Sequence, residues 1–280
     1  MPLAIVAGPD GNLWFTEFSA NKIGRITTAG VVTEFNVVTA ASSPFGITVG
    51  WDGALWFCER DVGKLGRITT AGAITEFATG DIAPAFIASG PDGALWFTDA
   101  NHVSIGRLTT VGSFSQFPVK PGTAPWGIVS GPDGALWFSE SSTILAPDKI
   151  GRITTAGVIT DFPVITSPSL PQLITAGPDG ALWFTETNAS KIGRITTAGA
   201  VSELAIPTAN GQPFGIAAGP DGNIWFAEGN ANNIGRIGLQ SSLQAQAAPA
   251  LSIAGLALLA FLLAGTATLF LRRRPASRQA

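Results

Sequence analysis

The amino-acid sequence predicts an all-β protein, a β-propeller of six recognisable four-stranded blades followed by one C-terminal transmembrane helix. Three observations carry this prediction: a motif G-x-D-G-x-[LI]-W-F that occurs six times, a spacing of 40 to 46 residues between its copies, and an uncharged apolar segment near the C-terminus. Repeats of roughly 20 to 50 residues are typical of solenoids and propellers. The repeat therefore sets the architecture of most of the chain.

Each repeat unit contains four short apolar runs separated by turn signals. It reads P-x-x-I, then GPDG-x-L-W-F-x-E, then K-I-G-R-I-T-T-A-G, and then x-x-T-E-F. The GPDG and TTAG segments end in glycine, which adopts the positive φ of a tight hairpin turn without steric cost. Four strands of about five residues and their turns account for about forty residues. The unit is therefore predicted to be a four-stranded antiparallel blade.

The second and third runs of the unit carry the predicted packing between blades. ALWF and IGRI are apolar at both alternating sets of positions, as expected of strands that are covered on both faces. Burial of one tryptophan contributes at most about 4–6 kcal/mol, from about 150–250 Å² at about 25 cal/mol/Å². We expect the recurrent tryptophan to be the main filler between blades (Trp14, Trp56, Trp96, Trp137, Trp183, Trp225).

Acidic and basic residues recur with the repeat. An aspartate stands in every DG turn and an arginine in every G-R run, and we expect them to satisfy each other or the turn amides. A second acid follows each WF and is interpreted as part of the scaffold. The alternative is a ring of carboxylates that holds Mg²⁺ or Ca²⁺, both of which favour oxygen ligands. These acids are Glu17, Glu59, Asp99, Glu140, Glu186 and Glu228.

The two ends of the repeat predict how the propeller closes. The first P-x-x-I begins directly after Met1, and the sixth unit stops at IGRIG (234–238) without a T-E-F strand. Neither end therefore offers a spare strand for closure. Either the sixth blade has three strands, or the native chain starts upstream of Met1.

Composition and charge exclude several classes of function. With 46% hydrophobic and 12% charged residues, the chain is unlike a disordered protein. The single cysteine, Cys58, allows no intrachain disulfide, and the single histidine, His102, allows no multi-histidine zinc site and little triad chemistry. Up to residue 250, 12 Lys and Arg face 19 Asp and Glu, a net charge of −7. That charge disfavours nucleic-acid binding.

The composition changes after the propeller (1–238). Residues 239–250 form an uncharged linker, and residues 251–271 form an uncharged, mainly apolar segment of 21 residues, long enough to span a bilayer. Arginines open the basic tail, 272–280, so the positive-inside rule keeps this tail cytoplasmic and the propeller outside. MPLAIVAGPDG has no secretory leader, which again predicts a start upstream of Met1. A tail-anchored intracellular protein is the alternative.

Over residues 2–238 the motifs P-x-G-I, GPDG-x-LWFTE, NKIGRITTAG and TEF resemble the repeat of the streptogramin lyases, or virginiamycin B lyases. The resemblance implies a seven-bladed propeller, here truncated at the N-terminus, that opens cyclic depsipeptide antibiotics by metal-assisted elimination. It also implies catalytic histidines directly after the proline of late blades, with a glutamate before one of those prolines. Neither residue type stands there in this chain, whose post-proline residues are Leu3, Phe45, Ala85, Trp126, Gln172 and Phe214. His102, in a turn between the second and third strands of its unit, is interpreted as a solvated loop histidine.

The C-terminal segment carries a second resemblance. PALSIAGLALLAFLLAG followed by RRR resembles the IPTL-type sorting signal of Gram-negative exported proteins. The resemblance implies passage across the inner membrane, then recognition and removal of the tail by a processing protease. We therefore expect a cell-envelope protein, anchored in the inner membrane through 251–271 or exported to the periplasm or cell surface after processing.

The sequence favours a binding or display module over an enzyme, with no catalytic residue, no metal ligand and no cofactor assigned. Phe45, Trp126, Gln172 and Phe214 are the candidate ligand-binding residues, near the central channel, for an unknown extracellular ligand. Aromatic faces with one polar group suit sugars or apolar ligands, although the same residues could simply fill the channel. The alternative is a carbon–oxygen lyase of the streptogramin B type that uses Mg²⁺.

Overall fold

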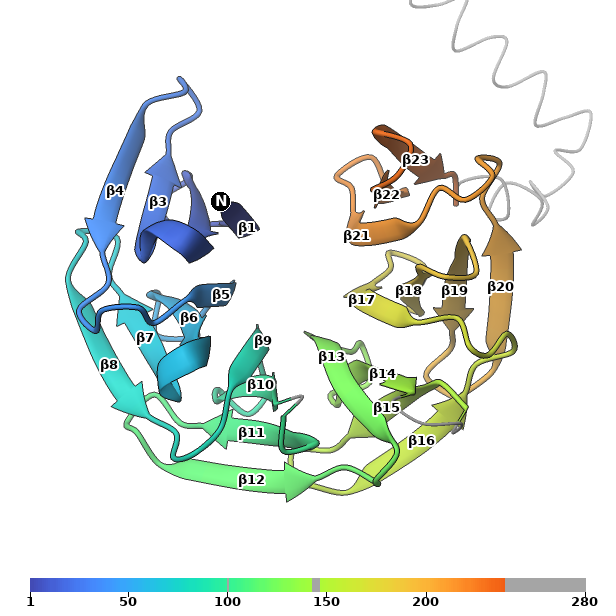
Figure 1. The fold of residues 1–280 in the computed structure, drawn as a ribbon, viewed down its shortest axis with the longest axis horizontal. Helices are drawn as coiled ribbons and strands as arrows, with labels where there is room; N and C mark the ends of the chain where they lie inside the picture. Colours follow the sequence, from blue (N-terminus) through green and yellow to red (C-terminus); the bar gives the residue numbers. More distant parts are fainter. Residues whose placement is uncertain (100, 143–146, 240–280) are drawn as a thin grey trace, which may run out of the picture. The chain divides into compact units, whose positions relative to one another are not determined.

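The computed structural model describes residues 1–99, 101–142 and 147–239, and its compact unit spans Met1–Gly238. The strands of the described residues form six antiparallel sheets that follow one another along the chain (Figure 1). The first three sheets contain β1 to β4 (Pro2–Ala7, Leu13–Glu17, Lys22–Ile26, Val32–Asn36), β5 to β8 (Pro44–Val49, Leu55–Glu59, Lys64–Ile68, Ile74–Ala78) and β9 to β12 (Pro84–Ser89, Leu95–Asp99, Ser104–Leu108, Phe114–Pro118). The others contain β13 to β16 (Thr123–Ser130, Leu136–Ser142, Lys149–Ile153, Ile159–Pro163), β17 to β20 (Pro171–Ala176, Leu182–Glu186, Lys191–Ile195, Val201–Ala205) and β21 to β23 (Pro213–Ala218, Ile224–Glu228, Asn233–Ile237).

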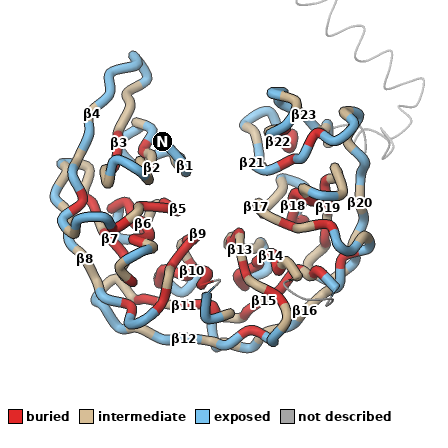
Figure 2. The backbone as a smooth tube through the Cα atoms, viewed as in Figure 1, coloured by how far each residue is buried: buried red, intermediate tan, exposed pale blue. Residues whose placement is uncertain are grey.

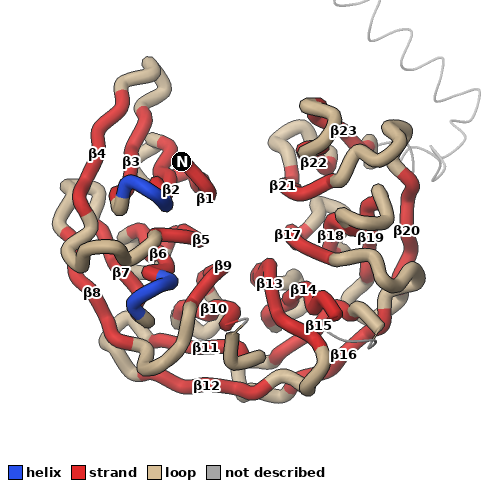
Figure 3. Tube along the Cα trace, in the orientation of Figure 1, coloured by secondary structure: helices blue, strands red, loops and turns tan. Residues whose placement is uncertain are grey.

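The predicted six-bladed propeller is confirmed. Each sheet is one blade, a meander whose strands pair in chain order, and the first strands of successive blades contact one another. Two short 3₁₀ helices, η1 (Phe18–Ala20) and η2 (Arg60–Val62), follow the second strands of blades 1 and 2 (Figure 3). The first five blades have four strands and the sixth has three, as the incomplete sixth repeat predicts.

The predicted linker, 239–250, lies outside the described residues except for Leu239, and the predicted segments 251–271 and 272–280 lie wholly outside them. Within the described ranges, we find no helix long and apolar enough to cross a membrane.

Burial follows the order of strands in each blade. The second strand is buried along its whole length in blades 2, 3 and 5, as the apolar ALWF run predicts. The fourth strands alternate between partly buried and exposed residues, and they form the outer rim in Figure 2. The core therefore lies between blades, where the second and third strands of neighbours face each other.

One polar network fixes the tryptophan of each inner blade. In blade 4 the indole Nε1 of Trp137 donates to Asp133 Oδ1 at 3.0 Å, while Arg152 Nε donates to Asp133 Oδ2 at 2.6 Å. The guanidinium of Arg152 also lies 5.9 Å from the centroid of the Trp137 ring. The aspartate–arginine pairing predicted from the repeat is thus confirmed, and the same two hydrogen bonds occur in blades 2, 3 and 5 (Asp52, Trp56, Arg67; Asp92, Trp96, Arg107; Asp179, Trp183, Arg194).

The tryptophans fill the junctions between blades, with one exception. Trp137 is fully buried against Leu182 and Phe184 of the next blade. Trp225 of blade 6 is 37% exposed, whereas the other five repeat tryptophans are at most 2% exposed. Blade 6 ends the series of blades (Figure 1), so within the described residues no further blade packs on its tryptophan face. On blade 1, Leu13 is correspondingly 44% exposed.

We predict that Trp137→Ala lowers the free energy of unfolding by about 3–5 kcal/mol, because it empties a closed junction. Trp225→Ala, in the same sequence motif, should cost less than half as much because its ring already contacts solvent. Urea titrations followed by circular dichroism measure both values. Equal losses for the two variants would contradict this account of the junctions.

Candidate functional site

Aromatic side chains from neighbouring first strands form one cluster beside the first strands of blades 2 to 4. Phe45 of β5 and Trp126 of β13, both predicted ligand residues, lie with ring centroids 6.2 Å apart. Phe86 of β9 stands between them, at 5.1 Å from Phe45 and 5.4 Å from Trp126. Phe18 adds an edge contact to Phe45 at 6.0 Å. We call Phe18, Phe45, Phe86 and Trp126 the aromatic cluster.

Local backbone geometry explains why these rings meet. Each first strand has an irregular register between its proline and its isoleucine, for example between Pro125 and Ile128, and such bulges re-aim side chains. Neighbouring first strands also touch through their backbones at glycine. A Cβ added to Gly46 would lie 2.7 Å from the carbonyl oxygen of Ala85, which is too close for any other residue type. The side chains that follow the prolines are therefore brought together.

The other two predicted ligand residues are placed differently. Gln172 on β17 is half-buried, and its side-chain Oε1 has no hydrogen-bond partner among the described residues. The indole Nε1 of Trp126 is likewise buried and has no partner in the described part of the chain. Phe214 on β21 is 42% exposed, and none of the ring contacts found among the described residues joins it to the aromatic cluster.

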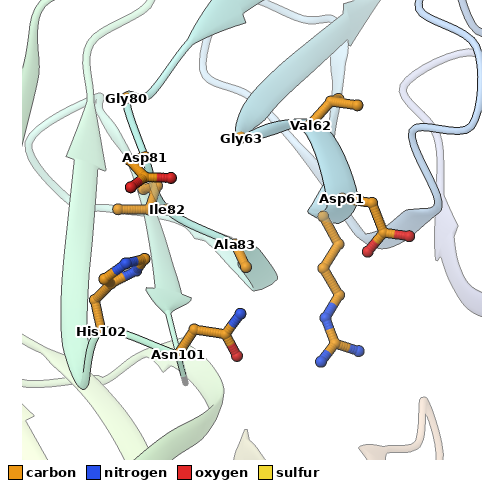
Figure 4. Close-up of a pocket in the computed structure, with 10 residues that line it drawn as sticks. Asp61, Val62, Gly63, Gly80, Asp81, Ile82, Ala83, Asn101 and His102 are labelled. Atoms are coloured by element: carbon orange, nitrogen blue, oxygen red, sulfur yellow. The ribbon is translucent and has the colours of Figure 1, made fainter.

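A cavity of about 590 Å³ opens between blades 2 and 3, next to the aromatic cluster. Arg60 lines this cavity, and its guanidinium carbon lies 5.2 Å from the ring centroid of Phe45, so the two features are continuous. In Figure 4, Asn101 and His102 project from one side and Asp61 lies on the opposite side. The lining residues are Arg60, Asp61, Val62, Gly63, Gly80, Asp81, Ile82, Ala83, Asn101 and His102.

His102 is an exposed loop histidine, as the sequence suggests, but its ring is also held by an acid. Its side chain is 46% exposed, but its ring Nδ1 lies 2.8 Å from Oδ2 of Asp99, whose side chain is fully buried. The other carboxylate oxygen of Asp99 accepts backbone N–H groups from Asn101 at 3.1 Å and His102 at 3.3 Å. The imidazole is therefore held by a fixed carboxylate.

The acids that follow WF do not assemble into a metal ring. Among the described residues, no group of three or more His, Cys, Asp or Glu side chains is placed to hold a metal ion. These acids instead lie within their own blades. Burial raises the pKa of Glu59 to about 7, and the neighbouring Glu76 carboxylate adds to the rise. Burial raises the pKa of Glu186 to about 8, again with a contribution from the acid in the fourth strand, Glu203.

Five residues of the cavity and the aromatic cluster were not predicted from the sequence: Arg60, Asp61, Asp81, Asn101 and Phe86. Phe86 follows the post-proline alanine, so it lies one position beyond the residues that were compared between blades. The loop residues after the WF acid vary from blade to blade, and only a comparison of those loops would have marked them. The sequence therefore shows that these loops differ between blades. It does not show that the loops of blades 2 and 3 lie on opposite sides of one cavity.

Comparison with known proteins identifies one family. The profile of the Virginiamycin B lyase family matches residues 1–98 and 78–259. The chain is similar to the selenomethionine-substituted virginiamycin B lyase from Staphylococcus aureus, with 42% identity and a TM-score of 0.78 over 84% of this chain and 79% of that one. The same values hold for the structure, with quinupristin, of a catalytically inactive variant of that enzyme in which one histidine is replaced by alanine.

A streptogramin B lyase structure is similar at 41% identity and a TM-score of 0.77, over 84% of this chain and 78% of that one. The search of curated proteins finds no match. The resemblance seen in the repeat motifs is thus confirmed at the level of family and fold.

The buried glutamates predict how stability changes with pH. Unfolded Glu186 titrates near 4.5, and the folded pKa is about 8, so between these values only the unfolded chain has lost the proton. This glutamate therefore makes the free energy of unfolding fall as pH rises from about 5 to about 8. Glu186→Gln should leave stability unchanged near pH 5 and raise it at pH 8 and above, by on the order of 1–2 kcal/mol.

Glu203→Gln, in the same blade, should have the opposite sign. Although burial opposes ionisation, the bonds from Lys191 and Thr166 hold the pKa of Glu203 below its ordinary value. The ionised form therefore stabilises the fold above its unfolded pKa, and that contribution is lost as pH falls through the lower, folded pKa. Urea titrations from pH 4 to 9 compare the variants. A loss of stability in Glu186→Gln at pH 8 would contradict the assignment.

Proposed function

Because the chain belongs to the virginiamycin B lyase family, we propose that it uses the propeller of that family to bind an extracellular ligand, without opening an antibiotic ring. One observation carries this proposal: aromatic side chains occupy and surround the post-proline positions. Phe45 and Trp126 follow their prolines directly and meet in the aromatic cluster. The family resemblance implies histidine at such positions in late blades, and here Gln172 and Phe214 stand there.

The chemistry of these side chains suits binding better than elimination. Elimination needs a base within hydrogen-bond reach of the substrate proton, and aromatic rings provide none. The half-buried rings of Phe86 and Trp126 offer flat apolar faces for stacking, whereas Phe45 is only 7% exposed and supports them from the core. The buried Nε1 of Trp126 and Oε1 of Gln172 are a donor and an acceptor without partners in the described structure. A ligand or ordered water at this place would satisfy them.

Display at the cell envelope is the second part of the proposal. The apolar segment 251–271 would anchor the chain in the inner membrane, and the arginines of 272–280 would stay in the cytoplasm. A processing protease that recognises the segment would release the propeller to the periplasm or the cell surface. The net charge of −7 up to residue 250 supports a partner other than nucleic acid.

A metal-dependent lyase of the streptogramin B type is the second candidate. It is favoured by the 42% identity with the Staphylococcus aureus virginiamycin B lyase over 84% of this chain. Such an activity would use Mg²⁺ and would need a base other than the histidine whose replacement inactivates that enzyme. In this chain the one imidazole belongs to His102, in a loop of blade 3.

Incubation of the purified protein with quinupristin and Mg²⁺ separates the two candidates. We expect the cyclic antibiotic to remain intact in reversed-phase chromatography with tandem mass spectrometry, because no base stands at the post-proline positions. Chromatographic separation is needed because elimination gives a linear product of the same mass. The Staphylococcus aureus lyase, assayed in parallel, is the positive control. Formation of the linear product above the rate without protein would overturn the binding proposal and establish the lyase.

A further inference from the structure

The cavity between blades 2 and 3 lies where two loops depart from the repeat. Each loop joins the second strand of its blade to the third: RDVG at 60–63 in blade 2 and ANHV at 100–103 in blade 3. The corresponding loops of blades 1, 5 and 6 read FSAN (18–21), TNAS (187–190) and GNAN (229–232). Among these five loops, only those of blades 2 and 3 carry charged or imidazole side chains: Arg60 and Asp61 in blade 2 and His102 in blade 3.

Blade 3 also departs from the repeat within its strands. In blades 1, 2, 4 and 5, a lysine at the start of the third strand pairs with an acid of the fourth (Lys22–Glu34, Lys64–Glu76, Lys149–Asp161, Lys191–Glu203). Blade 3 has Ser104 and Gln116 at these positions, joined by a neutral hydrogen bond of 2.8 Å. The acid after WF is Asp99 here and glutamate elsewhere. With no lysine opposite it in the register, Asp99 binds His102 instead.

The Asp99–His102 pair fixes the chemistry of one wall. A carboxylate oxygen accepts, so the proton of the neutral imidazole belongs to Nδ1, and Nε2 is left as an acceptor on the exposed side of the ring. Oδ1 of Asp99 is anchored in turn by N–H groups of the turn and, at 3.4 Å, of Ala83. An acceptor that is held this firmly is suited to recognition, because little rotamer freedom is lost on binding.

The opposite wall is equally constrained. Oδ2 of Asp61 accepts a hydrogen bond from Ser43 Oγ at 2.6 Å, and Arg60 rests on the ring of Phe45. Beneath them the chain is closely packed: a Cβ added to Gly63 would lie 2.5 Å from the carbonyl oxygen of Gly80. The cavity is therefore built by fixed elements, with polar groups facing each other across it.

We propose that this cavity binds a neutral carbohydrate, which names the ligand class of the binding function proposed above and rests on it. Hydroxyl groups donate and accept at once, and the walls offer both partners. Asp81, Asp61 and Nε2 of His102 accept, while Arg60 and Asn101 donate. A volume of about 590 Å³ lies within the range of small-molecule sites, about 300–1,000 Å³. The half-buried rings of Phe86 and Trp126 continue the site with faces on which a further sugar ring can stack.

Other ligand classes fit this lining less well. An anion would meet the carboxylates of Asp61 and Asp81, and a cation would meet the guanidinium of Arg60. An apolar ligand would leave these polar groups without water or a partner, at a cost of about 1–3 kcal/mol for each unpaired group. A neutral ligand with many hydroxyl groups avoids all three penalties.

The single histidine makes the test direct. In the full chain labelled with ¹⁵N-histidine, all ring signals belong to His102. Maltotriose, cellotriose and chitotriose are the probes, and trigalacturonate is the charged comparison. We expect at least one neutral trisaccharide to shift the Nε2 resonance saturably. The absence of any shift up to about 10 mM, beyond the millimolar Kd of a weak site, would overturn the carbohydrate assignment.

The trisaccharide that binds is then titrated calorimetrically into variants of the protein. This experiment separates carbohydrate binding in the cavity from the proposed binding function in general. Arg60→Ala and His102→Gln should each weaken binding about tenfold or more, as loss of a hydrogen-bond partner requires. Asn188→Ala, in the equivalent loop of blade 5, is the matched control and should leave the affinity unchanged. If only Trp126→Ala weakens binding, the cavity inference fails and the aromatic cluster retains the ligand. If ring opening of quinupristin is found, the proposed function fails first.

Discussion

The rest of the structure depends on a tryptophan held between a turn aspartate and a strand arginine and packed against the next blade. In blade 4, the indole N–H of Trp137 donates a hydrogen bond to Asp133, so the whole ring can be buried without an unsatisfied donor. Arg152 neutralises the same carboxylate and covers the ring face. Five residue types of the motif are fixed by this one arrangement: the glycines of the turn, the aspartate, the tryptophan, the arginine, and the motif phenylalanine of the next blade, which belongs to the same core cluster as the tryptophan.

Two places vary between blades while the junctions stay fixed. The first is the residue after each proline, and the second is the loop after each WF acid. Phe45 and Trp126 belong to the first place, and Arg60 and His102 to the second. The contact of Arg60 with the Phe45 ring joins the two into one surface. The scaffold repeats, and the departures from the repeat that support the proposed binding surface lie in blades 2 to 4.

The sequence was sufficient for the blades, because turn glycines and doubly apolar strands leave few alternatives to a four-stranded meander. The sequence also brought Phe45 and Trp126 forward as ligand residues, which stays a prediction. Phe86 was missed because it stands one position after the post-proline residue, where blades 2, 4 and 6 have glycine. The sequence shows Ser104 where blades 1, 2, 4 and 5 have lysine, but the contact of His102 with Asp99 became visible only in the structure. The exposure of Trp225 reflects the position of blade 6 in the series rather than its own sequence.

The central claim concerns side chains within PWGIVSGPDGALWFSE (125–140): Asp133, Trp137 and Phe138 serve packing, whereas Trp126 serves the proposed recognition. Saturation mutagenesis of these residues, with protease resistance of the full chain as the readout, measures this directly. We expect most substitutions at Asp133, Trp137 and Phe138 to abolish resistance, and most substitutions at Trp126 to preserve it. If Trp126 were as intolerant as Trp137, its ring would be part of the core, and the separation of scaffold from binding surface would be wrong.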